Sequence, residues 1–213
     1  MMNLPKSTEV GRIVAKERFY AKESYKIKDY FVNTIEKIIW ANKISPTTLN
    51  ISSKKYIELQ VFEVYLKLVD KKLNDIIRLI DSKIPYLILF LIIYKSEVKA
   101  IISYKQVKEE KTVIIEQFES AWQDAGSFKL GLKGNSVDAI YESYLYQIES
   151  DLHFGDNLDE NIDKYKQIKK LKAEIEKINR KIRKEPSIAK RQELARERKE
   201  LEGRIEEIQT SKK

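Results

Sequence analysis

The stretch IPYLILFLIIY, residues 84–94, is the most apolar run in the sequence. It is too short to cross a bilayer as a helix, which takes about 20 residues. Because a proline stands near its start and β-branched and aromatic residues dominate it, we expect a central strand buried in a sheet. Ser96 and Glu97 then predict a hairpin turn into a second strand over residues 98–104.

The segments on either side of this hairpin predict a sheet with helices packed against it. Residues 56–66 carry Ile57, Leu59 and Val61 in alternation with a partly apolar second face, as in a strand buried on both faces. Further strands are expected over residues 113–118 and, at an edge, 128–132, and helices over residues 10–22, 28–42, 71–81 and 137–151. The predicted fold class is α+β, a mixed β-sheet packed with helices.

The composition agrees with this fold class. Hydrophobic residues make up 42% of the 213 residues, enough for a core, and charged residues make up 35%, which indicates long solvated helices. The 6 glycines and 4 prolines are too few for an all-β sandwich with many turns.

The last quarter of the chain predicts an antiparallel coiled-coil helical hairpin. Two heptad seams follow one another, with the apolar residues Ile168, Leu171, Ile175, Ile178 and Ile182, then Leu194, Leu201, Ile205 and Ile208. Pro186 ends the first helix and Ser187 is a capping residue for the second, so we expect the seams to face each other over about 30 Å. The alternative is that each seam pairs with a second chain in a homodimer.

These patterns divide the chain into two domains. We expect an α+β globular domain over residues 1–155 and a basic antiparallel helical hairpin over residues 159–213, with the linker HFGDNL at residues 153–158. The net charge of +8 comes from the last quarter of the chain. Residues 1–161 contain 23 Lys+Arg and 23 Asp+Glu, whereas residues 162–213 contain 18 and 10.

The positive charge is densest in RKIRKEPSIAKR, residues 180–191, around the expected turn. Its six cations are the candidate nucleic-acid-binding residues Arg180, Lys181, Arg183, Lys184, Lys190 and Arg191. A neutral body with a positive appendage is typical of a protein that contacts phosphates, so duplex DNA is the expected partner. No aromatic residue is interleaved with them, so stacking on single-stranded bases is not predicted. The alternative is a solvated coiled-coil surface, rich in lysine and arginine because both form helices well.

The chain has no cysteine, and His153 is its one histidine. Disulfides, thiolate chemistry and imidazole-rich metal sites are therefore excluded, and a reducing, cytoplasmic location is expected. The first nine residues carry no apolar stretch of signal-peptide length, and no membrane partner is expected. No Gly-rich phosphate loop is present, and no serine or cysteine motif accompanies His153, for which we expect no catalytic role.

Three blocks and the basic coiled tail resemble a known family. The blocks are IIWANKISPTTLNI (residues 38–51), IELQVFEVYLKL (57–68) and LIDSKIPYLILFLI (79–92). In this order they are similar to the bacterial and archaeal domain of unknown function 4391 family, over nearly the whole chain. The resemblance brings no catalytic residues with it. It implies a context, because members tend to be encoded beside a DEAD/DEAH-type helicase and a site-specific DNA methyltransferase, as in restriction or phage-defence operons. Such a helicase or methyltransferase is thus an expected protein partner.

One pattern in the body is typical of a nuclease. Restriction enzymes of the PD-(D/E)xK kind hold Mg²⁺ with an acid and a Glu-x-Lys pair on neighbouring strands, because Mg²⁺ prefers oxygen ligands. Here Glu58 and Gln60 lie on the strand expected over residues 56–66, and Glu36 lies on the helix before it. Glutamine replaces the lysine, and the first acid is missing. The alternative is that Glu58 and Gln60 hydrogen-bond loop backbone, and no cofactor beyond this Mg²⁺ is expected.

A polar loop is a further candidate ligand site. It contains Asn42, Ser45, Thr47, Thr48 and Asn50, between a helix and a strand, a common place for ligand contacts. The same residue types also favour turns for structural reasons alone.

The sequence thus predicts, first, a non-enzymatic accessory subunit of a bacterial restriction or phage-defence system. Its body would dock on a partner protein, and its basic hairpin would contact nucleic acid or a negatively charged partner surface. The alternatives are a degenerate PD-(D/E)xK-like, Mg²⁺-dependent nuclease and a structural protein that dimerises through its C-terminal coil.

Overall fold

The structure, a computed structural model, describes residues 2–108, 111–152, 154–155 and 157–210. The chain forms two compact units, Met1–Glu149 and Ser150–Lys213. This division falls just before the linker expected at residues 153–158. Within the described ranges, no helix has both the length and the apolar character that a membrane crossing requires.

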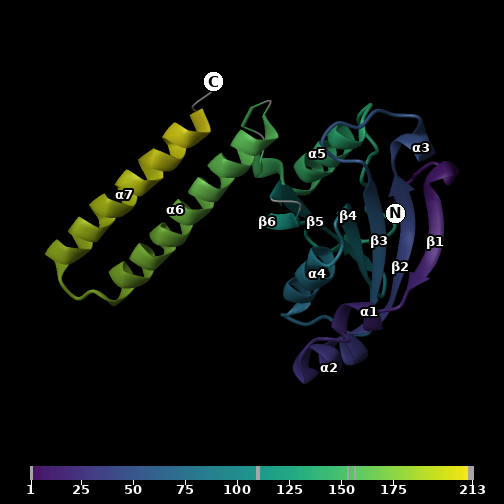
Figure 1. The fold of residues 1–213 in the computed structure, drawn as a ribbon. Coiled ribbons are helices and arrows are strands. Elements are labelled where there is room, and N and C mark those ends of the chain that lie inside the picture. Colours follow the sequence, from purple (N-terminus) through teal and green to yellow (C-terminus); the bar gives the residue numbers. More distant parts are fainter. Residues whose placement is uncertain (1, 109–110, 153, 156, 211–213) are drawn as a thin grey trace. The chain divides into compact units, whose positions relative to one another are not determined.

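The first unit is built on a seven-stranded sheet (Figure 1). Its strands are β1 (Glu9–Val14), β2 (Ile35–Ile44), β3 (Leu59–Leu66), β4 (Leu87–Tyr94), β5 (Glu97–Lys108), β6 (Lys111–Glu119) and β7 (Gln123–Asp124). Strands β1 to β6 follow one another across the sheet in chain order, and β7 pairs with β5. The β3–β4 pair is parallel and the other described pairs are antiparallel. The sheet is therefore mixed, and the predicted α+β class is confirmed.

Helices pack around this sheet. They are α1 (Glu17–Tyr20), α2 (Tyr25–Thr34), α3 (Pro46–Leu49), α4 (Leu73–Ser82) and α5 (Val137–Ile148), with a 3₁₀ turn η1 (Lys6–Thr8). Figure 1 shows α1 and α2 at one end of the sheet, and α3 and α5 toward the other. The Ser136 hydroxyl caps α5, the helix expected over residues 137–151, by accepting a hydrogen bond from the Ala139 N–H.

Strands β3 and β4 form the centre of the sheet, and α4 is their crossover. Parallel neighbours need such a connection, because a tight hairpin reverses the chain. Strand β4 is buried from Leu87 to Ile93, which confirms the central strand expected from the apolar run. Helix α4 buries its apolar stripe, including Ile77 and Ile80, against the sheet.

The two faces of the sheet have separate cores. On one face, the rings of Phe62 and Phe90 form a T-shaped pair with their centroids 6.0 Å apart, and they pack with Phe31 of α2 and with α4. On the other face, the completely buried Tyr141 of α5 donates a hydrogen bond from its hydroxyl to the Ser103 carbonyl at 2.8 Å. The sheet is thus covered on both faces near β4 and β5.

Three predicted elements are wrong. Residues 10–22, expected as a helix, form strand β1 and the short α1. The helix expected over residues 28–42 ends at Thr34, and Ile35–Ile44 is strand β2. Isoleucines at positions 35, 38 and 39 fit a helical spacing, but pairing with β1 and β3 favours the extended form, which suits β-branched residues. Residues 128–132, expected as an edge strand, form no strand in the structure.

The second unit is a helical hairpin. It consists of the 3₁₀ turn η2 (Ser150–Leu152) and the helices α6 (Leu158–Lys184) and α7 (Ile188–Thr210). Ile168, Leu171 and Ile178 of the first seam are buried, and the residues of the second seam are half-buried. The two seams therefore pack against each other within the chain. Because α6 has 27 residues, it is about 40 Å long and exceeds the expected 30 Å.

Candidate functional site

The turn of the hairpin is fixed by its own residues. Glu185 leaves helical geometry with φ −81° and ψ 118°, as a residue before proline tends to do. Its carboxylate accepts a hydrogen bond from the Ser187 N–H at 3.0 Å. The hydroxyl of Ser187 accepts a long hydrogen bond of 3.5 Å from the Lys190 N–H, which starts α7. A short, locally held turn thus joins the end of α6 to the start of α7.

The six predicted cations surround this turn, and all are exposed. They are Arg180, Lys181, Arg183, Lys184, Lys190 and Arg191, which we call the tip cluster. Within the described part of the second unit, the ion pairs involve none of these six cations. The tip cluster therefore presents six exposed cations that no described ion pair holds.

The lysines and arginines of the tip cluster differ in their surroundings. A hollow of about 520 Å³ at the tip is lined by Lys181, Lys184 and Lys190, together with three glutamates, at 185, 193 and 197. The three arginines do not line it. The lysines thus face carboxylates nearby, and the arginines are the better candidates for contact with an external anion.

Helix stability accounts for one half of the tip cluster. Lys181, Arg183 and Lys184 lie in the last turn of α6, where cations interact favourably with the helix dipole. The first turn of α7 contains no acidic residue, and Lys190 and Arg191 lie at this end, where positive charge is unfavourable. The stability of α7 therefore does not explain Lys190 and Arg191.

In the body, the structure brings Glu58 and Gln60 together. Both are buried, and the Gln60 amide donates a hydrogen bond of 2.5 Å to the Glu58 carboxylate. The other carboxylate oxygen of Glu58 lies 2.8 Å from the Nζ of Lys43, a contact the sequence reasoning missed. The carboxylate is therefore already neutralised by a side chain of β2.

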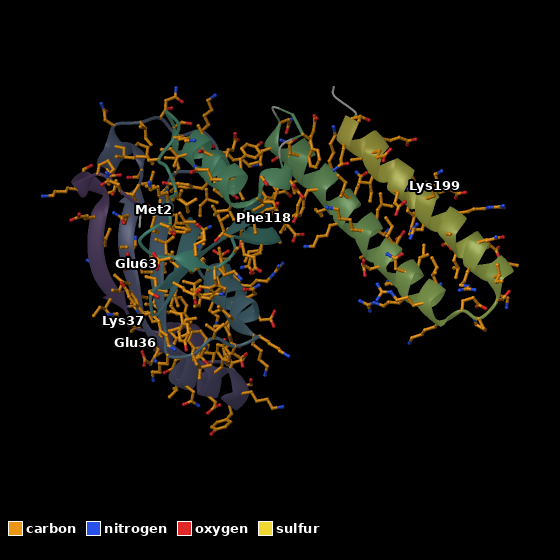
Figure 2. All side chains as sticks on the ribbon, turned by 180° about the vertical axis from the view of Figure 1, so that it is seen from behind. Met2, Glu36, Lys37, Glu63, Phe118 and Lys199 are labelled. Carbon is orange, nitrogen blue, oxygen red and sulfur yellow. The ribbon has the colours of Figure 1, made fainter. Side chains whose placement is uncertain are left out.

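Glu36 does not join this pair. It lies on β2 and not on a helix. Its neighbour Ile35 begins this strand and pairs with Leu66 of β3. Figure 2 shows Glu36 beside Lys37 at the end of the sheet near α2. Glu58 precedes Leu59, which pairs with Ile44 at the opposite end of β2, about 25 Å away by the rise of a strand. Over the described residues, no group of three or more acids or histidines could hold a metal ion.

The side chains of the polar loop make local contacts. Ser45 and Thr48 form a capping box around α3, and the Ser45 hydroxyl lies 3.0 Å from that of Thr47. Asn50 ends α3 in the left-handed conformation with φ 52°. The Asn42 amide donates to the threonine hydroxyl of η1 at 2.9 Å. These contacts give the loop residues a structural role, and ligand binding there stays a prediction. His153 lies outside the described residues.

A buried ion pair is a further feature that the sequence reasoning missed. Lys105 and Asp81 are almost completely inaccessible to solvent, and their charged atoms lie 2.6 Å apart. Burial raises the pKa of Asp81 and lowers the pKa of Lys105, and each charge counteracts the effect on the other. The sequence does contain a signal for the burial of Asp81. This residue follows Ile77 by four positions and therefore lies on the apolar side of α4.

The fold and the tip cluster define a class: an α+β protein with a mixed sheet that carries a helical hairpin with a basic tip. The chain matches the family described as Domain of unknown function (DUF4391) over residues 2–205. It belongs to this family, as the resemblance of its sequence blocks predicted. No curated protein matches the chain, and no solved structure does.

Proposed function

We propose that this protein is a non-enzymatic, cytoplasmic accessory subunit of a bacterial restriction or phage-defence system, and that its hairpin binds duplex DNA through the tip cluster. The observation that carries the proposal is a set of six exposed cations around one tight turn, none of which forms an ion pair with a described residue. The defence context and the helicase or methyltransferase partner rest on the family resemblance.

The distribution of charge supports DNA as the ligand. The chain up to residue 161 has no net charge, so the excess of +8 lies in residues 162–213, within the hairpin. Cations that contact phosphates release condensed counterions, which gives binding without any requirement for base sequence. Residues 166–213 contain no aromatic side chain, so contact with the backbone of a duplex is favoured over stacking on unpaired bases.

The arginines are expected to contribute most. A guanidinium can donate two parallel hydrogen bonds to one phosphate, whereas an ammonium acts as a point charge. Arg180, Arg183 and Arg191 also lie outside the hollow that the glutamates line. Lys181, Lys184 and Lys190 add to the field around them.

The test is fluorescence-anisotropy binding of the full chain to labelled duplex DNA across a salt series. In one variant Arg180, Arg183 and Arg191 are changed to Gln; in the matched control Lys170, Lys177 and Lys199, exposed along the helices, are changed to Gln. Both variants lose three charges. We expect the arginine variant to bind at least about 10-fold more weakly than the control and to show a salt slope lower by about 3.

Two results would contradict the proposal. If the full chain fails to bind duplex DNA at low salt, the tip cluster is a solvated helix surface. If both variants lose affinity equally, binding is spread over the whole hairpin and the tip has no special role. The nuclease alternative is checked in the same samples with Mg²⁺ and a cleavage gel, where it requires cleavage that Glu58→Ala abolishes.

A further inference from the structure

A second concavity lies on the first unit, between β1, β2 and β3 and the end of α4. Its volume is about 460 Å³, within the range of about 300–1,000 Å³ for small-ligand sites. Its lining combines four aromatic side chains with three cations, which are Phe19, Trp40, Phe62, Tyr86, Arg12, Arg18 and Lys83. Among the described residues, no carboxylate lines it. We call it the aromatic pocket.

A bulge in β2 brings Trp40 to this pocket. Lys43 pairs with Gln60 and Asn42 with Val61, so an unbroken ladder would place residue 41 opposite Phe62. Instead the register shifts by one residue, and Trp40 lies opposite Phe62. Because side chains alternate between the two faces of a strand, this shift places the indole on the pocket face.

A bulge in β1 brings Arg12 to the same place. Glu9 pairs with Asn42, so an unbroken ladder would place Gly11 opposite Trp40 and Arg12 on the other face. The register shifts here too, and Arg12 lies opposite Trp40. Gly11 has φ 62°, a left-handed conformation that glycine adopts at little cost. Two adjacent strands are thus both bulged where each delivers a pocket residue, and bulges are common beside functional sites.

The pocket has a positive rim. Arg12 and Arg18 are exposed, and the ion pairs described in this unit do not include them. The Lys83 ammonium is held by the Glu23 carboxylate at 2.5 Å and by the Phe19 carbonyl at 2.7 Å. The two arginines therefore supply the uncompensated charge, and they suit an anion such as phosphate.

A buried polar group completes the lining. Gln60 is 5% exposed and uses one amide N–H for its hydrogen bond to Glu58. Within the part of the chain that the structure describes, its second N–H and its carbonyl oxygen make no side-chain hydrogen bond and are open to a ligand. A glutamine amide offers a donor and an acceptor side by side, which matches the polar edge of a nucleobase.

We propose that the aromatic pocket binds a nucleoside phosphate. The base stacks on Trp40 and hydrogen-bonds Gln60, and the phosphate lies between Arg12 and Arg18. The ligand is either a free nucleotide or an unpaired nucleotide of a single strand, since both present the same chemistry. This inference concerns the globular unit and does not depend on DNA binding by the hairpin.

The experiment uses the full chain with Trp122→Phe, which leaves Trp40 as the sole tryptophan. Adenosine 5′-monophosphate, adenosine, inorganic phosphate and a short single strand of DNA are titrated, and binding is followed by Trp40 fluorescence and by calorimetry. We expect the monophosphate to quench Trp40 saturably, and adenosine or phosphate alone to bind at least about 10-fold more weakly. Tighter binding of the single strand than of the monophosphate identifies a strand as the source; equal or weaker binding identifies a free nucleotide.

The variant Arg12→Gln with Arg18→Gln tests the phosphate contact, and its matched control is Lys71→Gln with Lys72→Gln. Both pairs are exposed, and the lysines line no part of the pocket. We expect about 10-fold weaker binding in the arginine variant and no change in the control. The arginine variant of the tip cluster should bind the monophosphate like the unaltered chain, which separates this site from the hairpin. The absence of any saturable binding, or an equal loss in both paired variants, would overturn the proposal.

Discussion

The Lys105 ammonium on β5 lies 2.6 Å from the Asp81 carboxylate on α4, and both side chains are almost fully buried. The same ammonium donates hydrogen bonds to the carbonyls of Asp81, Ile84 and Tyr86 at 3.0, 3.2 and 2.7 Å. It thereby holds the end of α4 and the segment that enters β4. Because Lys83 and Tyr86 of this segment line the aromatic pocket, the pair also fixes one wall of that pocket.

Loss of the lysine should destabilise the protein strongly. Lys105→Met leaves Asp81 buried without its counter-charge, and the removal of one partner of a buried pair costs about 3–5 kcal/mol. The matched control is Lys99→Met on the same strand, where the ion pair with the half-exposed Glu119 is worth less than about 1 kcal/mol. Urea unfolding at pH 7.5 measures both variants, and equal losses would contradict a special role for Lys105.

The destabilisation by Lys105→Met should shrink in acid. Burial already raises the pKa of Asp81, and loss of the lysine raises it further, since the lysine charge counteracts the effect of burial. The folded variant then keeps a proton that the unfolded chain releases above the ordinary carboxyl pKa of about 4. Its stability relative to the parent therefore falls as the pH rises above that value. Unfolding at pH 4.5 and 7.5 should show the smaller difference at pH 4.5.

The elements that the sequence predicted well are those whose burial follows one simple period. Strand β4 is apolar throughout, and the seams of α6 and α7 repeat in heptads. Strand β2 was missed because its isoleucines fit a helix as well as a strand, and the choice depends on β1 and β3, which are distant in sequence. The period of an isolated segment cannot supply that tertiary information.

The candidate sites likewise differ in whether the sequence alone could predict them. The tip cluster could be read from charge alone, because its residues are neighbours in sequence. The aromatic pocket could not, since it depends on two bulges that shift the register by one residue. A shift of this kind changes the face of Trp40 and leaves the hydrophobic pattern unchanged. The pairing of Lys43 with Glu58 likewise depends on the register of β2 against β3.

Two glycines should respond to alanine in opposite ways. Gly134 has φ 129°, and a Cβ there would lie 2.8 Å from the Ile140 backbone nitrogen at the capped start of α5, so Gly134→Ala should cost about 2–4 kcal/mol. Gly203 lies within α7 with nothing within 4 Å, so Gly203→Ala should stabilise by about 0.5–1 kcal/mol. Hydrogen exchange of the α5 and α7 amides reports each effect. Unchanged protection of α5 in Gly134→Ala would show that the loop adapts to the methyl group.

The seam between α6 and α7 should be sensitive at buried positions only. Ile178 is 4% exposed and packs in the seam, so Ile178→Ala should cost about 2–4 kcal/mol and increase hydrogen exchange in both helices. Ile188, at the start of α7, is 67% exposed, and Ile188→Ala should change stability by less than about 0.5 kcal/mol. Similar exchange in the two variants would mean that the hairpin is not held by its seam.

The Glu23 carboxylate should limit the affinity of the aromatic pocket for a nucleoside phosphate. It lies 2.5 Å from the Lys83 ammonium and neutralises the third cation of the rim. Glu23→Gln keeps the shape and removes the charge, so the affinity for adenosine 5′-monophosphate should rise by about 2- to 5-fold, the scale of a partly exposed ion pair. The gain should fade at high salt, and Lys83→Met added to Glu23→Gln should abolish it. Calorimetry at low and high salt provides the measurement, and a gain that survives Lys83→Met would assign the effect to something other than the freed ammonium.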